Sequence, residues 1–163
     1  IYQLLKTHFS QPELVVEELL QRAEKSMMDE LRINLFEDNL QRLVDFGHSF
    51  SQRIEEKSNF QISHGEAVGI DMLICIFIAI QRNLCEKSVL DRVIKLYKFA
   101  RLPINQKVCN AKDLLDSLQT IRTHRGGDLN LVLPSRIGGA LFVQDMTHTE
   151  INQAITYFDS ITF

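Results

Sequence analysis

Two histidines, each next to a glycine, are the residues in this sequence whose types and spacing best suit chemistry. His48 lies in Asp45-Phe-Gly-His-Ser-Phe50, and His64 follows sixteen residues later in Ser63-His-Gly-Glu66. Imidazole nitrogens and carboxylate oxygens bind zinc, cobalt or iron, and a catalytic metal site keeps one coordination position open. The spacing leaves room for a helix, a loop and a return of the chain. It allows a shared metal ion, and it equally allows two histidines that cap helices or pack in a core.

Four carboxylates flank the histidines: Asp45, Glu55, Glu66 and Asp71. Glu66 admits three interpretations: a metal ligand, a group that orients His64, or an acid in the first turn of a helix. Carboxylates beyond the metal ligands often orient a ligating histidine, and acids are favoured near the positive end of the helix dipole. On the residues alone these interpretations stay open.

A second polar cluster, Thr123-His-Arg-Gly-Gly127, lies just before the apolar segment that starts at residue 129. Arginine matches the geometry of phosphate, and glycines let backbone amides approach an anion. His124 and Arg125 are therefore candidates for anion binding, while a solvated turn before a strand explains them equally well. Further phosphate candidates, each also consistent with an ordinary surface charge, are Arg42, Arg53 and Arg136.

The composition is that of one soluble globular domain. The chain has 163 residues, of which 45% are hydrophobic and 24% charged, and its net charge of -3 gives no basic footprint for nucleic acid. The three cysteines are odd in number and lack Cys-x-x-Cys spacing, which favours buried free thiols in a reducing, cytoplasmic compartment. The most apolar segment, residues 72–80, is too short to span a bilayer. We therefore expect neither a nucleic acid nor a membrane as a partner.

Hydrophobic periodicity predicts a mainly α-helical chain. The expected helices cover residues 10–32 (with an interruption allowed near Ser26), 39–47, 49–57, 65–82, 89–100 and 111–121, after a short apolar piece at 2–9. The period then changes, and short strands are expected at residues 129–134 and 139–144, joined by a turn at 135–138. Thr147-His-Thr-Glu150 is typical of a capping box that begins a last helix ending near residue 158. The predicted fold is a single helical domain over residues 1–163 with one small, late β-hairpin.

The two histidine motifs resemble a known family. Phe46-Gly-His-Ser-Phe50, Ser63-His-Gly-Glu-Ala-Val68 and Leu131-Val-Leu-Pro-Ser-Arg-Ile-Gly138 are similar to segments of the C-terminal metal-binding domain of the 3-dehydroquinate synthase superfamily. The resemblance covers nearly the whole chain. It implies that His48 and His64 are two of three protein ligands to a catalytic zinc or cobalt ion. The third ligand, a glutamate, and the NAD-binding domain are expected upstream of Ile1.

Within the superfamily the chain resembles the cyclases that use sedoheptulose 7-phosphate, the group that includes 2-epi-5-epi-valiolone synthases. The segment over residues 28–37 is similar to theirs, and Asp45 stands where dehydroquinate synthases have asparagine. Asp71 replaces a small residue of those enzymes, and the His124-Arg125 turn replaces their lysine pair. Gln52 departs from both groups, because dehydroquinate synthases have a second histidine there and valiolone synthases tend to have proline. A neutral polyol suits acceptors such as Asp45 and Asp71, whereas a substrate carboxylate calls for cations.

The resemblance therefore implies the C-terminal half of an NAD- and metal-dependent sugar-phosphate cyclase, a phosphate-eliminating lyase of cyclitol biosynthesis that is inactive without its upstream half. The implied catalytic residues are His48, His64 and Asp71, and the implied substrate-binding residues are Arg42, Asp45, Gln52, His124 and Arg125. The implied partners are a sugar phosphate, the NAD domain of the same protein and a second copy in a homodimer. The alternatives are 3-dehydroquinate synthase itself, a polyol or alcohol dehydrogenase of the superfamily, and a non-catalytic helical interaction domain.

Overall fold

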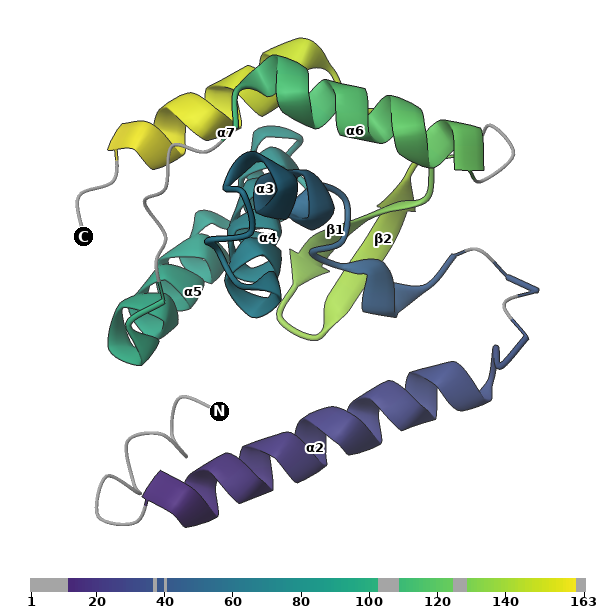
Figure 1. Cartoon of the computed structure of the whole chain (residues 1–163), viewed down its shortest axis with the longest axis vertical. Coiled ribbons are helices and arrows are strands. Elements are labelled where there is room, and N and C mark those ends of the chain that lie inside the picture. Colours follow the sequence, from purple (N-terminus) through teal and green to yellow (C-terminus); the bar gives the residue numbers. More distant parts are fainter. Residues whose placement is uncertain (1–11, 37, 40, 103–108, 125–128, 161–163) are drawn as a thin grey trace. The chain divides into compact units, whose positions relative to one another are not determined.

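The structure is a computed structural model, and it describes residues 12–36, 38–39, 41–102, 109–124 and 129–160. The chain divides into two compact units, residues 1–44 and residues 45–163, and each is described here by itself. Most of the described residues are helical, with a single β-hairpin late in the chain (Figure 1), so the predicted fold class is confirmed. That the chain forms one domain stays a prediction. The apolar piece expected at residues 2–9 lies outside the described residues.

The first unit contains one long helix, α2 (Pro12–Arg32). Its side chains pair along the surface, where Arg22 forms an ion pair with Glu18 and Gln21 donates to Glu17 at 3.3 Å. Pairs four residues apart stabilise an exposed helix by about 0.2–0.5 kcal/mol each. The interruption allowed near Ser26 is absent, because the helix is continuous through that residue.

The prediction of a helix at residues 39–47 is wrong. Only a single 3₁₀ turn forms there, η1 (Leu43–Asp45). Asparagine side chains bond the backbone that follows them instead: Asn34 Nδ2 donates to the Asn39 carbonyl at 2.6 Å, and the Gln41 amide donates to Asn39 Oδ1 at 2.9 Å. Such side-chain bonds offer the backbone an alternative to the helix, and Gly47 then takes a positive φ of 86° that no helix continues.

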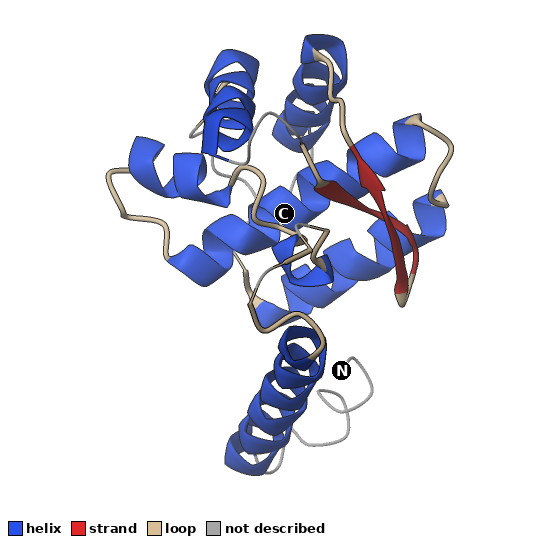
Figure 2. Cartoon of the chain, turned by 90° about the vertical axis from the view of Figure 1, so that its right-hand side faces the viewer, coloured by secondary structure: helices blue, strands red, loops and turns tan. Residues whose placement is uncertain are grey.

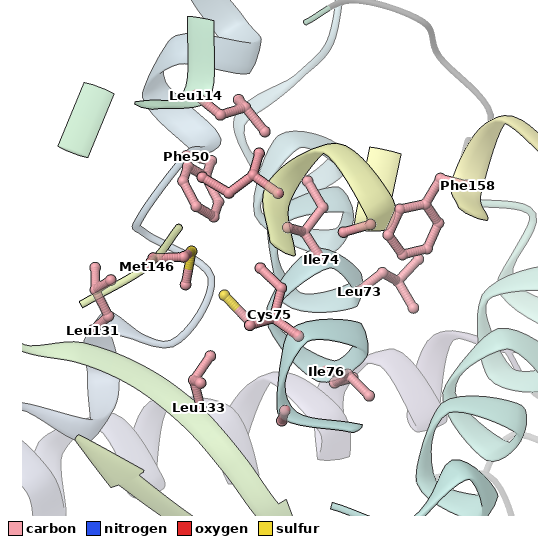
Figure 3. Packing of buried hydrophobic residues seen from close by; sticks show 14 of the residues in the cluster. Phe50, Leu73, Ile74, Cys75, Ile76, Leu114, Leu131, Leu133, Met146 and Phe158 are labelled. Carbon is pink, nitrogen blue, oxygen red and sulfur yellow. The ribbon is translucent and has the colours of Figure 1, made fainter. Parts of the chain in front are cut away.

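The second unit is built around α4 (His64–Gln81), which contacts α3 (Ser51–Lys57), α5 (Lys87–Ala100), α7 (His148–Ser160) and the first strand of the hairpin. A further helix, α6 (Ala111–His124), packs on α7 and α3. The predicted helices at residues 49–57, 65–82, 89–100 and 111–121 are therefore confirmed with small shifts in their ends. Figure 3 shows side chains of α4, among them Leu73 and Cys75, in one cluster with Phe50, Leu114, Leu133 and Phe158.

The hairpin consists of β1 (Leu131–Arg136) and β2 (Gly139–Val143), which pair antiparallel in a register that opposes Leu131 to Val143. Figure 2 shows the two strands in red among the helices. The predicted strands are confirmed, although β1 begins and ends two residues later than expected and the turn shrinks to two residues. Gly138 makes this tight turn with a φ of 76°.

A partly buried arginine fixes the far end of α4. Arg82 donates to both carboxylate oxygens of Glu150, at 2.6 and 2.9 Å, and to the side chain of Asp145 at 3.1 Å. The predicted capping box at residues 147–150 is present, since the Thr147 amide donates to Glu150 and the Glu150 amide donates to Thr147 Oγ1. Glu150 therefore caps the start of α7 and joins this helix to Arg82 at the end of α4.

Of the described helices, α4 is the one long and apolar enough to cross a membrane by length and composition. It exceeds the nine-residue apolar segment seen in the sequence because its first and last turns are also largely uncharged. Half of it is buried inside the protein, and its side chains at Leu73, Cys75 and Ile78 are fully enclosed. These features are those of the central helix of a packed core.

Candidate metal centre

His48 is the one exposed residue in a run of buried ones. Gly47, Ser49, Phe50 and Ser51 are all buried, whereas the His48 side chain is exposed. Three independent contacts hold this run in place: the packing of Gly47 on α4, the hydrogen bonds of Phe50 and Ser51 to Asp71, and a bond from α6 to the Ser49 carbonyl. The imidazole therefore projects from a segment whose backbone is fixed.

The first contact is a close approach of Gly47 to α4. A Cβ atom at this position would lie 2.8 Å from Met72 Cγ, 2.9 Å from Val68 Cγ1 and 3.1 Å from the Val68 carbonyl oxygen. Glycine is required here for two reasons, because its φ of 86° is strained for other residues and because a side chain has no room. The backbone before His48 consequently lies directly on the helix that begins at His64.

The second contact is a buried carboxylate. Asp71 is fully buried, and its Oδ2 accepts the Phe50 amide at 2.5 Å and the Ser51 amide at 2.9 Å, while Oδ1 accepts the Cys75 thiol at 3.3 Å. Burial raises the pKa of the Asp71 carboxyl from 3.8 to about 6, against the lowering effect of these hydrogen bonds and of His48. These amides begin α3, so Asp71 caps that helix from α4.

The third contact comes from α6. Ser117 Oγ donates to the Ser49 carbonyl at 3.4 Å and, at 2.6 Å, to the Leu114 carbonyl of its own helix. The bond to Ser49 is long, and it adds to a segment that α4 already holds. The backbone that carries His48 is therefore held by α4, with a weaker contact from α6.

His64 is the first residue of α4, and a carboxylate from α3 holds its ring. His64 Nδ1 lies 2.9 Å from Glu55 Oε1, and the Glu55 side chain is mostly covered, at 19% exposed, against 63% for His64. The turn after α3 brings Glu55 to this position, because Asn59 and Phe60 both take positive φ values and reverse the chain. A carboxylate on Nδ1 fixes the ring and leaves Nε2 available to a ligand.

The two imidazoles lie as close as a shared metal ion requires. Their ring centroids are 5.5 Å apart and their planes are inclined by 54°. Two histidines on one tetrahedral zinc, with Zn–N bonds of about 2.0–2.1 Å, place their ring centroids roughly 5 Å apart. The observed separation matches this value, so the residues present fit a divalent ion held by His48 and His64.

Within the described ranges, no group of three or more His, Cys, Asp or Glu side chains is placed to hold a metal ion. Glu66, one of the candidates, accepts the Ser63 amide at 2.8 Å and so caps the start of α4. Of its three interpretations, the first-turn acid is the one this contact supports. A metal site built on His48 and His64 needs at least one further ligand that is not among the described side chains.

Three of the predicted substrate-binding or catalytic residues have contacts that the structure describes. Asp45 is half-buried, and its carbonyl accepts the His48 amide at 2.9 Å. Gln52 is exposed in the first turn of α3, where its Nε2 donates to Glu56 at 3.3 Å. Asp71, in contrast, is enclosed and bonded through both oxygens, so its position does not support the predicted direct contact with substrate.

The remaining predicted residues cannot be placed against the histidines. Arg42 belongs to the first unit, His124 is the last residue of α6, and Arg125 lies outside the described residues. Their roles stay predictions. Arg53, another phosphate candidate, pairs instead with Glu56 at 3.1 Å and donates to the carbonyl of residue 113 at 3.3 Å, which ties α3 to α6.

Comparison with known proteins places these features in a family. Residues 1–122 match the family model described as 3-dehydroquinate synthase C-terminal. The chain is 40% identical over 137 residues to 2-epi-5-epi-valiolone synthase of Streptomyces hygroscopicus subsp. jinggangensis, a match that covers 84% of this chain and 33% of the relative. It is 29% identical over 159 residues to demethyl-4-deoxygadusol synthase of Trichormus variabilis, covering 94% of this chain and 39% of that enzyme. The chain therefore spans about a third of the length of the curated relatives it matches.

Solved structures agree with the sequence matches. The structure of the Streptomyces hygroscopicus 2-epi-5-epi-valiolone synthase with NAD+ and Zn2+ bound superimposes with a TM-score of 0.86 at 36% identity, over 96% of this chain and 45% of that one. A crystal structure of 2-deoxy-scyllo-inosose synthase superimposes with a TM-score of 0.59 at 19% identity, over 75% of this chain and 35% of that one. At that identity the second likeness bears on the fold alone.

Proposed function

The chain belongs to the family of 3-dehydroquinate synthase C-terminal domains, and from this premise we propose that it is the metal-binding part of a sugar-phosphate cyclase acting on sedoheptulose 7-phosphate. The observation that carries the proposal is the pair His48 and His64, 5.5 Å apart between ring centroids, with Glu55 on the second ring. The identity of 40% to a 2-epi-5-epi-valiolone synthase supports this substrate class over others in the superfamily.

In this proposal His48 and His64 bind one zinc or cobalt ion through their ring nitrogens, and the third ligand comes from the part of the protein upstream of Ile1. Glu55 keeps the His64 ring in the orientation and tautomer that leave Nε2 unprotonated for the metal. When bound, the ion supplies a Lewis acid for a substrate hydroxyl, and NAD held mainly by the upstream part supplies a reversible hydride acceptor.

The substrate is oriented by polar groups around the histidines. Asp45 and Gln52 lie three residues before and four residues after His48, where they offer hydrogen bonds to the hydroxyls of a neutral polyol. Arg42, His124 and Arg125 remain the candidates for phosphate binding, and the guanidinium groups of the two arginines are suited to pairs of phosphate oxygens. Dehydroquinate synthase, which binds a carboxylate, has histidine at the position of Gln52, so Gln52 speaks against that enzyme without selecting one cyclase.

The complete protein is a phosphate-eliminating lyase that works in the cytoplasm as a homodimer, with its NAD part and this part on one chain. The chain spans about a third of the length of its curated relatives, and the structure of one of these relatives holds NAD+ and Zn2+. The chain alone is inactive, because two histidines without a third ligand hold zinc weakly.

Phosphate release by the full-length protein with NAD and Co²⁺ tests this proposal. We expect release from sedoheptulose 7-phosphate and none from the carboxylate-bearing substrate of dehydroquinate synthase. His64→Ala is expected to abolish release while the circular dichroism spectrum is retained, because the side chain is exposed and its loss leaves the core intact.

Release from the carboxylate substrate alone would overturn the choice of substrate and identify a divergent dehydroquinate synthase. Net NADH formation without phosphate release would identify a dehydrogenase instead. If His64→Ala retained both turnover and bound metal, the assignment of His64 as a ligand would be wrong.

A further inference from the structure

The buried polar cluster behind His48 has no counterpart elsewhere in the described core. The buried polar or charged residues of the described chain are Ser49, Ser51, Asp71 and Asn130. Three of these four meet at one place, immediately behind the exposed imidazole of His48. Burying a carboxylate is costly unless several hydrogen bonds compensate it, so a carboxylate retained here has a purpose other than packing.

The hydrogen bonds of Asp71 indicate that purpose. Both amides that it accepts, those of Phe50 and Ser51, belong to the backbone two and three residues after His48. Phe50 is the N-cap residue of α3, and it has no side chain suited to capping. The donors at the start of α3 would be left unsatisfied in the protein interior without the carboxylate from α4.

Asp71 also lies in the helix that carries the other histidine. It is seven residues from His64, which is two turns of an α-helix and returns to the same face. α4 therefore presents His64 from its first turn and holds the His48 segment from its second and third turns, where Val68 and Met72 also enclose Gly47. One rigid element determines the positions of both histidines.

We propose that Asp71 is a positioning residue that fixes His48 relative to His64 by capping α3 from α4, and that it does not touch the substrate. This inference rests on the proposed function, because it assigns a purpose to the separation of two metal ligands. What Asp71 contributes is a hydrogen-bond acceptor at the amides of Phe50 and Ser51. Asparagine can retain that acceptor, and leucine, of similar size, cannot.

The test is Co²⁺ affinity, measured by equilibrium dialysis on the full-length protein and its variants. Asp71→Leu is expected to weaken Co²⁺ binding about 10–100-fold, as the loss of groups that orient metal ligands does. Asp71→Asn is expected to stay within about threefold of the wild type, because its carbonyl accepts the same amides. Glu150→Gln is the control, since it weakens the far end of α4 and is expected to lower the melting temperature with wild-type Co²⁺ affinity.

Hydrogen exchange of the metal-free protein gives a second measurement that does not depend on activity. In Asp71→Asn, the peptide containing the amides of Phe50 and Ser51 is expected to exchange several-fold faster than in the wild type, because an amide oxygen is a weaker acceptor than a carboxylate. Peptides of α7 provide the internal reference. This measurement remains decisive if Asp71→Leu fails to fold.

The outcomes separate the inference from the proposed function. Wild-type Co²⁺ affinity in Asp71→Leu, or unchanged exchange at Phe50 and Ser51 in Asp71→Asn, would overturn the positioning role. Loss of turnover in Asp71→Asn with Co²⁺ affinity retained would show that the carboxylate acts on the substrate, which also overturns it. Failure of the wild-type protein to bind Co²⁺ would instead refute the proposed metal site.

Discussion

Gly47 is the position where a single added methyl group should separate the two histidines. Gly47→Ala introduces two effects that the structure resolves: a residue with φ near 86°, and a Cβ atom within 3.0 Å of Met72 and Val68. The first costs about 1–2 kcal/mol for a residue with a side chain. The second adds about 1–3 kcal/mol of overpacking, because Met72 can move but the branched Val68 side chain and its carbonyl cannot. We expect a total loss of about 2–5 kcal/mol in the free energy of unfolding.

Two other glycines serve as matched controls for these effects. Gly138 has a φ of 76°, and an added Cβ there meets nothing within 4 Å, so Gly138→Ala carries the strain without the overpacking. Gly65 lies in α4 with equally open space and no strained φ. Gly138→Ala should therefore cost about 1–2 kcal/mol, and Gly65→Ala should be neutral or stabilising by up to about 1 kcal/mol.

The assay is urea denaturation of the three variants beside the wild type, with midpoints compared at a common m value. The informative quantity is the difference between Gly47→Ala and Gly138→Ala, which isolates the close approach to α4. If the two variants were equally destabilised, the contact of Gly47 with Val68 and Met72 would be too loose to fix the His48 segment. The reasoning about the rigidity of this segment would then be wrong.

Two further predictions concern carboxylates that hold other groups in place. In the full-length protein, Glu55→Gln is expected to weaken Co²⁺ binding about 10–100-fold, because an amide holds the His64 ring and its tautomer less firmly; an unchanged affinity in dialysis would exclude this role of Glu55. The Arg82 guanidinium holds the pKa of the Glu150 carboxyl at about 2, below its usual 4.5, so this ion pair stabilises the fold above pH 4.5 and the contribution is lost as the pH falls toward 2. Glu150→Gln should accordingly cost about 1–3 kcal/mol at pH 7 and progressively less below pH 4.5 in urea titrations, whereas a pH-independent difference would contradict the assignment.

The local sequence signals were reliable where periodicity and capping agreed. The apolar run after His64 predicted α4 to within one residue at each end, because a nearly continuous apolar pattern and the Gly at position 65 leave few alternatives. The prediction at residues 39–47 failed because the apolar spacing there was helical while the asparagine side chains at 34 and 39 bonded the backbone. That competition is decided by contacts that propensity does not include.

In the site, too, the residues could be predicted from local motifs, whereas the contacts between distant parts of the chain could not. Both histidines were recognised from their motifs, and three interpretations of Glu66 were left open, but Glu55 was not singled out as the carboxylate that holds His64. Glu55 reaches His64 through a turn in which Phe60 has a φ of 58°, an unusual conformation for a bulky residue that no sequence pattern predicts. Asp71 was recognised as unusual, but its burial could be seen only once α3 and α4 were packed.

The concentration of these contacts on α4 has a consequence for how substitutions act. A core change that tilts α4, such as truncation of Leu73, moves His64 and, through Asp71, the His48 segment with it. Such a change lowers stability but leaves the separation of the two imidazoles nearly unchanged. Changes at the contact between α4 and the His48 segment alter that separation directly, because packed elements shift as units and strain gathers at their contacts. We therefore expect substitutions within α4 to lower stability with little change in metal affinity, and substitutions between α4 and residues 47–51 to lower both.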